Sequence, residues 1–464
     1  MILARLAAAC LLPGFEGLEP PDWLRRWAED GLGGVLLFSR NVESREQVAA
    51  LTAALPGLVV AIDEEGGDVT RLEHATGSSY PGNYALGVVD DVELTERVAA
   101  AIGAELAAVG VSLNLAPVAD VNTNPRNPVI GVRSFGSDPE LVSRHVGAYV
   151  IGLQGAGVAA CAKHFPGHGD TEVDSHLDLP TVRGDLAAAL LPFRAAIEAG
   201  VRAIMTAHIR VPELDDAPAT LSRRILHGLL REELGFTGVV VTDALDMKGV
   251  ATMGIECAVR ALASGADALC LGSGLGPEPL ETAHRAIVEA VRAGRLAEER
   301  LADAAARVAD MSATAPGDCH VTVTAVGLAA ARRALRAEGA VELSRPPVVV
   351  ELTPEPSIAA GPARHGLGDV LGAETVRGDA GPRGLPADRQ LVLVLRDAHR
   401  HAWERETAEL LLAAAPDAVV VETGLPLWRP DGAAGWIATH GYGRANLEAA
   451  AEVLGATSRR RRSR

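Results

Sequence analysis

The residues best suited to chemistry lie together in one stretch, KHFPGHGDTEVDSH, which runs from Lys163 to His176. It combines a lysine, three histidines and three acidic residues, so it could bind a metal, transfer protons or form a simple polar loop. The four-residue spacing of His164 and His168 would suit a zinc site on one face of a helix. The proline and glycines around His168 exclude that helix, and no His-x-His pair occurs on an early strand. We therefore expect no metal.

The last three residues of this stretch, Asp174, Ser175 and His176, favour a proton-transfer site. In an extended loop, side chains two positions apart point the same way. The Asp174 carboxylate would then hold one imidazole nitrogen of His176 and leave the other facing a substrate. A neighbouring carboxylate favours the imidazolium, which donates a proton to a leaving group and later takes one back. A pattern this short also arises by chance, so alone it is weak evidence.

The elements that must position these residues are predicted from eight short apolar runs, each ending in polar residues or glycine. Between most of them lie Ala/Leu/Arg/Glu-rich segments with helical spacing, for example 93–110 and 190–202. Apolar strands that alternate with amphipathic helices indicate a parallel sheet covered by helices, and eight repeats predict a TIM-like (β/α)8 barrel. The runs are 10–15, 34–39, 58–63, 111–120, 158–165, 203–209, 239–244 and 268–273.

Polar residues end many of these runs. In a barrel the chemistry lies at the carboxyl ends of the strands, whereas in an open doubly wound sheet a ligand would lie at a switch point between strands. Polar groups at so many strand ends favour the closed barrel. They are Asp63, Asp120, Lys163 with His164, His208 and Asp243.

A second domain is predicted in the last third of the chain. Residues 1–312 carry the barrel pattern, residues 313–345 are interpreted as a linker and a connecting helix, and residues 346–464 as a smaller α/β sandwich domain. The run 327–343 predicts that connecting helix.

Inside the second domain, apolar runs predict strands at 347–352, 389–396 and 417–424, with a helix at 407–415 between the last two. The Pro/Gly-rich stretch 354–388 predicts a poorly ordered connection or a long loop. The arginine-rich end of the chain is typical of a solvated, frayed terminus.

Composition limits the function classes. The chain has 464 residues, of which 48% are hydrophobic and 22% charged, so it can bury a full core. Its net charge of -17 argues against a nucleic-acid binder, because phosphate contacts need a basic face. No P-loop or GxGxxG spacing occurs, and no apolar stretch is long enough to cross a membrane. We expect no cofactor, no nucleic-acid partner and no membrane partner.

The five cysteines show no CxxC spacing, and three lie in apolar runs as small core residues would. A reducing compartment fits this pattern. The start, MILARLAAAC, could pass for a lipoprotein signal ending at Cys10, but its apolar run is very short and the next residues continue it as a strand. We expect a cytoplasmic protein, with export as a lipoprotein through Cys10 as the alternative.

The motifs of residues 1–312 resemble those of glycoside hydrolase family 3, and within it the bacterial β-N-acetylglucosaminidases of peptidoglycan recycling. FEG, GGVLLFSRNV, AIDEEGG, LAPVADV, RSFGSDP, KHFPGHGDT, DSH and ELGFTGVVVTDALDM fall in the family order. The resemblance implies a retaining exo-enzyme that releases terminal β-linked N-acetylglucosamine from muropeptide fragments through a covalent glycosyl-aspartate.

The same resemblance assigns roles to individual residues. It implies that Asp243 in VVVTDALDM is the nucleophile and that His176 with Asp174 is the acid/base. This departs from the usual pair of carboxylates in retaining glycosidases. The residues that it places around the sugar are Asp63, Arg71, Arg133, Lys163 and His164, with His208 lining the pocket and Met247 as its apolar wall.

Each assignment has a plainer alternative. Asp243 could be a helix N-cap, Asp246 is a rival nucleophile, Arg71 and Arg133 could form surface salt bridges, and His164 could be a buried core histidine. For the whole protein, the alternatives are a phosphorylase or a β-glucosidase on the same scaffold, or a non-catalytic sugar-binding protein. The aglycone specificity and the oligomeric state stay open.

Overall fold

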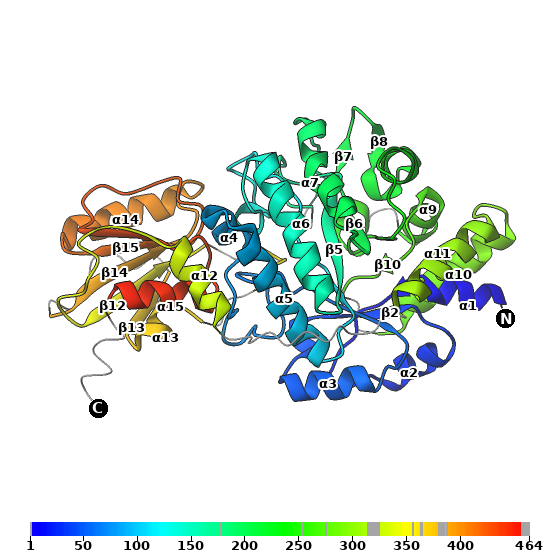
Figure 1. Ribbon diagram of the computed structural model, residues 1–464, viewed down its shortest axis with the longest axis horizontal. Helices are drawn as coiled ribbons and strands as arrows, with labels where there is room; N and C mark the ends of the chain where they lie inside the picture. Colours follow the sequence, from blue (N-terminus) through cyan, green and yellow to red (C-terminus); the bar gives the residue numbers. More distant parts are fainter. Residues whose placement is uncertain are drawn as a thin grey trace. The chain divides into compact units, whose positions relative to one another are not determined.

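The computed structural model in Figure 1 describes residues 2–175, 178–251, 254–273, 276–312, 325–354, 357–361, 365–378, 386 and 388–455. The chain forms two compact units that are not contiguous in sequence. Unit 1 comprises Met1–Glu64, Val92–Ile130 and Gly136–Val323, and unit 2 comprises Glu65–Asp91, Gly131–Phe135 and Thr324–Arg464. The sequence-based domain limits, 1–312, 313–345 and 346–464, stay a prediction.

Unit 1 contains eight parallel strands, one in each of the eight apolar runs, so this prediction is confirmed. They are β1 (Leu11–Leu12), β2 (Gly34–Leu37), β3 (Val59–Ile62), β4 (Leu113–Asn114), β5 (Ala159–Phe165), β6 (Ala203–Thr206), β9 (Val239–Val241) and β10 (Leu269–Cys270). Six of them form one curled sheet in the order β2-β3-β4-β5-β6-β9, while β1 pairs with β10.

Single contacts join these two sheets into the predicted barrel. A bridge between Val241 and Ala268 links β9 to β10. On the other side, the Leu36 N–H donates to the Pro13 carbonyl at 3.0 Å, which links β2 to the end of β1. A short hairpin of β7 (Arg210–Val211) and β8 (Asp215–Pro218) follows β6.

Helices connect successive strands of unit 1 (Figure 1). The helices predicted at 93–110 and 190–202 are confirmed, the second beginning at Leu186, where the Asp185 carboxylate accepts the Ala188 N–H as an N-cap. The helices of unit 1, of which α1 precedes β1 and α10 and α11 follow β10, are α1 (Ile2–Ala9), α2 (Asp22–Glu29), α3 (Arg45–Ala53), α5 (Val92–Ala108), α6 (Pro139–Gly155), α7 (Leu186–Glu198), the π-helix η4 (Arg224–Glu233), α8 (Lys248–Ala251), α9 (Glu256–Ser264), α10 (Glu278–Arg292) and α11 (Glu298–Ser312), with short 3-10 turns at Ser39–Asn41 and Ala219–Leu221. Within the described residues, no helix is both long and apolar enough to span a bilayer.

Unit 2 contains a six-stranded sheet in the order β11-β16-β15-β14-β12-β13, parallel except for the edge strand β11. The strands are β11 (Arg336–Gly339), β12 (Pro347–Leu352), β13 (Glu374–Arg377), β14 (Gln390–Leu395), β15 (Val419–Glu422) and β16 (Gly435–Ala438). The helices are α4 (Asn83–Val89), α12 (Val326–Ala334), α13 (Leu367–Leu371), α14 (Ala402–Ala414) and α15 (Arg444–Val453), with a 3-10 turn at Gly131–Arg133. One apolar core contains residues of α13 and α15, and the other contains residues of α14, so helices cover both faces of the sheet.

Two predictions for this region are wrong. The run 327–343 is not one helix: α12 ends at Ala334, and β11 then pairs antiparallel with β16, with Gly339 at a φ of 75° that helices do not use. The stretch 354–388 is not only a loop, since α13 and β13 lie in it. Tertiary pairing with a neighbouring strand stabilises these short polar strands, whose own sequences carry no apolar alternation.

Candidate active site

Alternation along the strands places three predicted site residues at one end of the barrel. The apolar core inside unit 1 includes residues of β3, β5 and β9. Because strand side chains alternate between faces, the residue two positions after each core residue faces the same way. These residues are Asp63 after Ala61, Lys163 after Cys161 and Asp243 after Val241. The barrel therefore turns three charged groups toward its carboxyl end.

Lys163 and Asp63 form a tight ion pair, with Lys163 Nζ 2.6 Å from Asp63 Oδ1. The lysine side chain is 2% exposed and the aspartate side chain 20% exposed. The carboxylate thus has one oxygen fixed by the ammonium while part of its surface remains open to a ligand. A carboxylate held in this way suits hydrogen bonds from sugar hydroxyls.

The fully buried Asp120 organises the start of the KHFPGHG motif. Its Oδ2 contacts His164 Nδ1 at 2.7 Å, and its Oδ1 accepts the backbone N–H groups of His164 at 3.2 Å and His168 at 2.6 Å. One side chain at the end of the fourth apolar run therefore holds both histidines. His164 is buried and its Nδ1 has Asp120 as a partner, as the alternative of a buried core histidine requires.

The nucleophile predicted from the sequence, Asp243, is half-buried, and its Oδ1 accepts the Ala244 N–H at 2.8 Å. One carboxylate oxygen of Asp243 is thus held by the backbone of the residue that follows it.

The rival nucleophile, Asp246, is exposed and accepts hydrogen bonds from the Ser273 N–H at 2.9 Å and the Ser273 hydroxyl at 3.2 Å. These bonds tie its carboxylate to the loop that follows β10. Asp243 instead lies two positions past Val241, the last residue of β9, where the strand alternation turns it toward the carboxyl end of the barrel.

Residues around Asp243 support its loop. His208 is fully buried, with Nδ1 2.8 Å from the Thr220 hydroxyl and Nε2 donating to the Ala244 carbonyl at 3.0 Å. Met247 is 6% exposed, and its part in the wall of the sugar pocket stays a prediction. The geometry therefore gives His208 a part in holding the backbone next to Asp243, whereas its predicted contact with substrate stays a prediction.

The predicted acid/base falls at the edge of the described residues. Asp174 is 8% exposed, whereas His176 lies outside the described residues. The dyad therefore stays a prediction.

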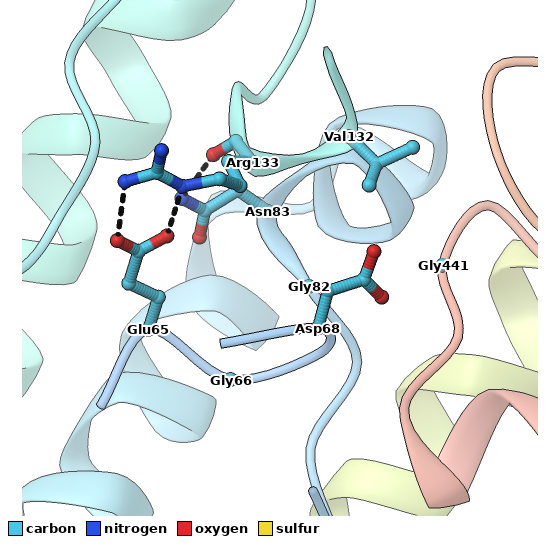
Figure 2. A pocket seen from close by; sticks show the side chains of 8 residues that line it. All are labelled: Glu65, Gly66, Asp68, Gly82, Asn83, Val132, Arg133 and Gly441. Carbon is cyan, nitrogen blue, oxygen red and sulfur yellow. Dashed lines mark hydrogen bonds and ion pairs between the residues drawn. The ribbon is translucent and has the colours of Figure 1, made fainter. Parts of the chain in front are cut away.

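Arg133 and Arg71 belong to unit 2. Figure 2 shows Arg133 in a two-bond pair with Glu65, Nε to Oε2 at 3.0 Å and Nη2 to Oε1 at 2.8 Å, while Asn83 donates to the Arg133 carbonyl at 2.7 Å. Arg71 is 8% exposed and its Nη2 donates to the Ala359 carbonyl at 2.8 Å. The Arg133 pair is buried, so it is not the surface salt bridge considered as the alternative.

Sequence reasoning missed several of these supporting residues. Glu65 stands two positions after Asp63 in AIDEEGG, a spacing that could have drawn attention to it. Ser175 was named only as the residue between Asp174 and His176, and no sequence signal shows that its hydroxyl and that of Thr171 contact His168. Among the described residues, no group of three or more His, Cys, Asp and Glu side chains is arranged to hold a metal ion.

Comparison with known proteins shows the family to which the chain belongs. The model of the glycosyl hydrolase family 3 N terminal domain matches residues 24–311, more than half of the chain. The chain belongs to glycoside hydrolase family 3. The solved structure of a family 3 β-N-acetylglucosaminidase from Paenibacillus sp. str. FPU-7 has a TM-score of 0.85 and 34% identity, and the match covers 98% of this family 3 chain and 97% of that one.

Curated relatives of this family 3 chain carry related names. Beta-hexosaminidase A of Pseudoalteromonas piscicida is 37% identical over 334 residues, which are 64% of this chain and 56% of that protein. The chain thus spans little more than half the length of that relative. Beta-hexosaminidase of Thiobacillus denitrificans is 40% identical over 263 residues, which are 53% of this chain and 73% of that protein.

Proposed function

We propose that this family 3 protein is a retaining exo-β-N-acetylglucosaminidase that hydrolyses terminal, non-reducing β-linked N-acetylglucosamine. The proposal rests on the match to the family model, together with the strand alternation that turns Asp63, Lys163 and Asp243 toward the carboxyl end of the same barrel. The names of the similar β-hexosaminidases and of the Paenibacillus enzyme support the choice of sugar.

The proposed reaction has two steps. Asp243 attacks the anomeric carbon and forms a glycosyl ester, while the bond to the leaving oxygen breaks and His176, held by Asp174, gives that oxygen a proton. A water molecule then attacks the same carbon as His176 takes up its proton, and the ester bond to Asp243 breaks. Two displacements retain the β configuration.

The remaining residues bind the sugar in this proposal. Asp63 accepts hydrogen bonds from sugar hydroxyls, and the Lys163 ammonium holds that carboxylate in place. His164, which Asp120 holds, has the sugar-binding role that the resemblance implies. Arg71 and Arg133 keep the same role as part of the proposal. We also propose a cytoplasmic location and muropeptide fragments as natural substrates.

The test is hydrolysis of 4-nitrophenyl β-N-acetylglucosaminide by the wild type and by Asp243→Asn, with Asp246→Asn as the matched control. We expect Asp243→Asn to lose at least about 10³-fold in kcat, since it removes the nucleophile, and Asp246→Asn to retain most activity. Activity should persist with a chelator present. Full activity of Asp243→Asn, or equal losses in both variants, would refute the role of Asp243.

Product analysis separates the alternatives. Release of N-acetylglucosamine that does not depend on phosphate supports a hydrolase, whereas N-acetylglucosamine 1-phosphate formed only with phosphate would indicate a phosphorylase. Faster turnover of the matching β-glucoside would indicate a β-glucosidase. Binding of the sugar without turnover of either glycoside would indicate a sugar-binding protein.

A further inference from the structure

His168, in the middle of the KHFPGHG motif, has no step in the proposed mechanism, yet both of its ring nitrogens are bonded inside the barrel unit. Nδ1 lies 2.8 Å from the Thr171 hydroxyl and Nε2 lies 2.9 Å from the Ser175 hydroxyl. The residue is 2% exposed, and burial lowers the pKa of its imidazole to about 4. A neutral imidazole has one donor and one acceptor nitrogen, which matches two hydroxyl partners.

The backbone of His168 is fixed as firmly as its ring. Its N–H donates to the buried Asp120 carboxylate at 2.6 Å, and its carbonyl accepts the Asn127 side-chain amide at 2.9 Å. A Cβ at the next residue, Gly169, would lie 1.8 Å from the Val121 carbonyl oxygen, so the chain passes in direct contact with a neighbouring segment. The imidazole therefore projects from a rigid base.

In the described part of the segment that His168 contacts, residues 171–175, the large apolar side chain is that of Val173. Val173 is 42% exposed, so it does not tie the segment to the core. Ser175, by contrast, is 2% exposed, and its carbonyl accepts the Gly249 N–H at 3.4 Å. A Cβ on Gly249 would lie 3.2 Å from that carbonyl oxygen, so the close approach favours glycine. Ser175 is thus held between His168 and α8, the helix that follows Asp243.

We propose that His168 is a positioning residue for the acid/base: its bond to the Ser175 hydroxyl fixes the residue that separates Asp174 from His176. This inference rests on the proposed function, from which it takes the acid/base pair. A general acid must lie within hydrogen-bond reach of the leaving oxygen, and a displacement of about 1 Å costs on the order of 100-fold in rate. Asp120, His168 and Ser175 form a continuous link from the barrel to this turn.

Two variants of His168 separate its two ring contacts. The amide of asparagine reaches the place of Nδ1, beside Thr171, whereas the amide of glutamine reaches the place of Nε2, beside Ser175. His168→Asn should therefore lose the contact with Ser175, and His168→Gln should keep it. Ser175→Ala removes the same contact from the other side. Ser264→Ala is the matched control, because its buried hydroxyl donates to the Leu221 carbonyl in another part of the unit.

The activity test compares an alkyl β-N-acetylglucosaminide, whose leaving group needs a proton, with the 2,4-dinitrophenyl glycoside, whose leaving group does not. We expect His168→Asn and Ser175→Ala to lose roughly 10- to 100-fold in kcat on the alkyl glycoside and less than about threefold on the activated one. His168→Gln should regain most of the loss. Equal losses on both glycosides, or no loss on the alkyl glycoside, would overturn the proposal.

Hydrogen exchange tests the link without relying on activity. The Gly249 N–H, which donates to the Ser175 carbonyl, should exchange at least about tenfold faster in His168→Asn than in His168→Gln, since the first variant releases Ser175. Unchanged exchange in His168→Asn would overturn the link. If the wild type hydrolyses neither glycoside, the proposed function fails, and faster exchange would still support the anchoring of this turn.

Discussion

The Lys163–Asp63 pair allows a quantitative prediction about the barrel. Lys163→Met keeps the length of the side chain and removes its charge, which leaves the Asp63 carboxylate without its ammonium partner at 2.6 Å. Asp63→Asn does the reverse and leaves the ammonium, 2% exposed, without a full counter-charge. The double variant removes both charges.

The expected magnitude follows from burial. Breaking a buried ion pair by removing one partner costs about 3–5 kcal/mol, because the other charge stays desolvated. Asp63 is 20% exposed, so water relieves part of this cost, and we expect about 3 kcal/mol for Lys163→Met and more for Asp63→Asn. At about 2–4 °C per kcal/mol, Lys163→Met should lower the Tm by roughly 6–12 °C.

The assay is a double-mutant cycle by chemical denaturation. With both charges removed there is no unpaired ion, so the double variant should cost less than the sum of the single variants by about 3 kcal/mol. The exposed pair Arg295–Glu256, with side chains 48% and 51% exposed, is the control and should show a coupling of about 0–1 kcal/mol. Additive costs at Lys163 and Asp63 would refute the reasoning, since they would mean that water already screens the pair.

Two further predictions concern buried carboxylates. Burial raises the pKa of Glu422 to about 8 from 4.5, so the folded state binds its proton more tightly, and the stability from this group is complete below about pH 4.5 and is lost as pH rises through 8. Glu422→Gln, which mimics the neutral acid, should therefore raise the Tm relative to wild type more at pH 8 than at pH 5, and an equal change at both would contradict this. Asp267, fully buried, accepts hydrogen bonds from Arg231 at 2.6 Å and Arg300 at 2.5 Å, so Asp267→Ala should lower the free energy of unfolding of unit 1 by roughly 3–5 kcal/mol in urea; a cost below about 1 kcal/mol would contradict it.

Most of the barrel could be predicted from the sequence, because its strands lie in short apolar runs and polar residues end many of these runs. The same alternation that buries Cys161 turns Lys163 toward the mouth of the barrel, so core and site share one pattern. The errors fell on β11 and β13, short polar edge strands whose formation depends on a neighbouring strand. Local sequence carries no information about that neighbour.

The candidate site was predicted less completely. The resemblance supplied residues that would touch substrate, whereas the residues that hold them come from distant segments. Asp120 contacts His164 across 44 positions of sequence, and Glu65 contacts Arg133 across 68. Pairing over such distances depends on the fold, and a single sequence does not reveal it.

The division of the chain into two interleaved units has a consequence for protein engineering. Residues 65–91 belong to unit 2 together with residues 324–464. Within this unit Asp68 pairs with Arg396 at 2.5 Å, and Glu73 pairs with Arg444 at 2.8 Å. A truncation after residue 312 would strip these carboxylates of their arginines, and a chimera joined at that point would match the segment to a foreign partner. A chimera that keeps unit 2 intact must take residues 65–91, 131–135 and 324–464 from the same parent. Unit 2 is therefore exchanged as three segments of the chain and not as one.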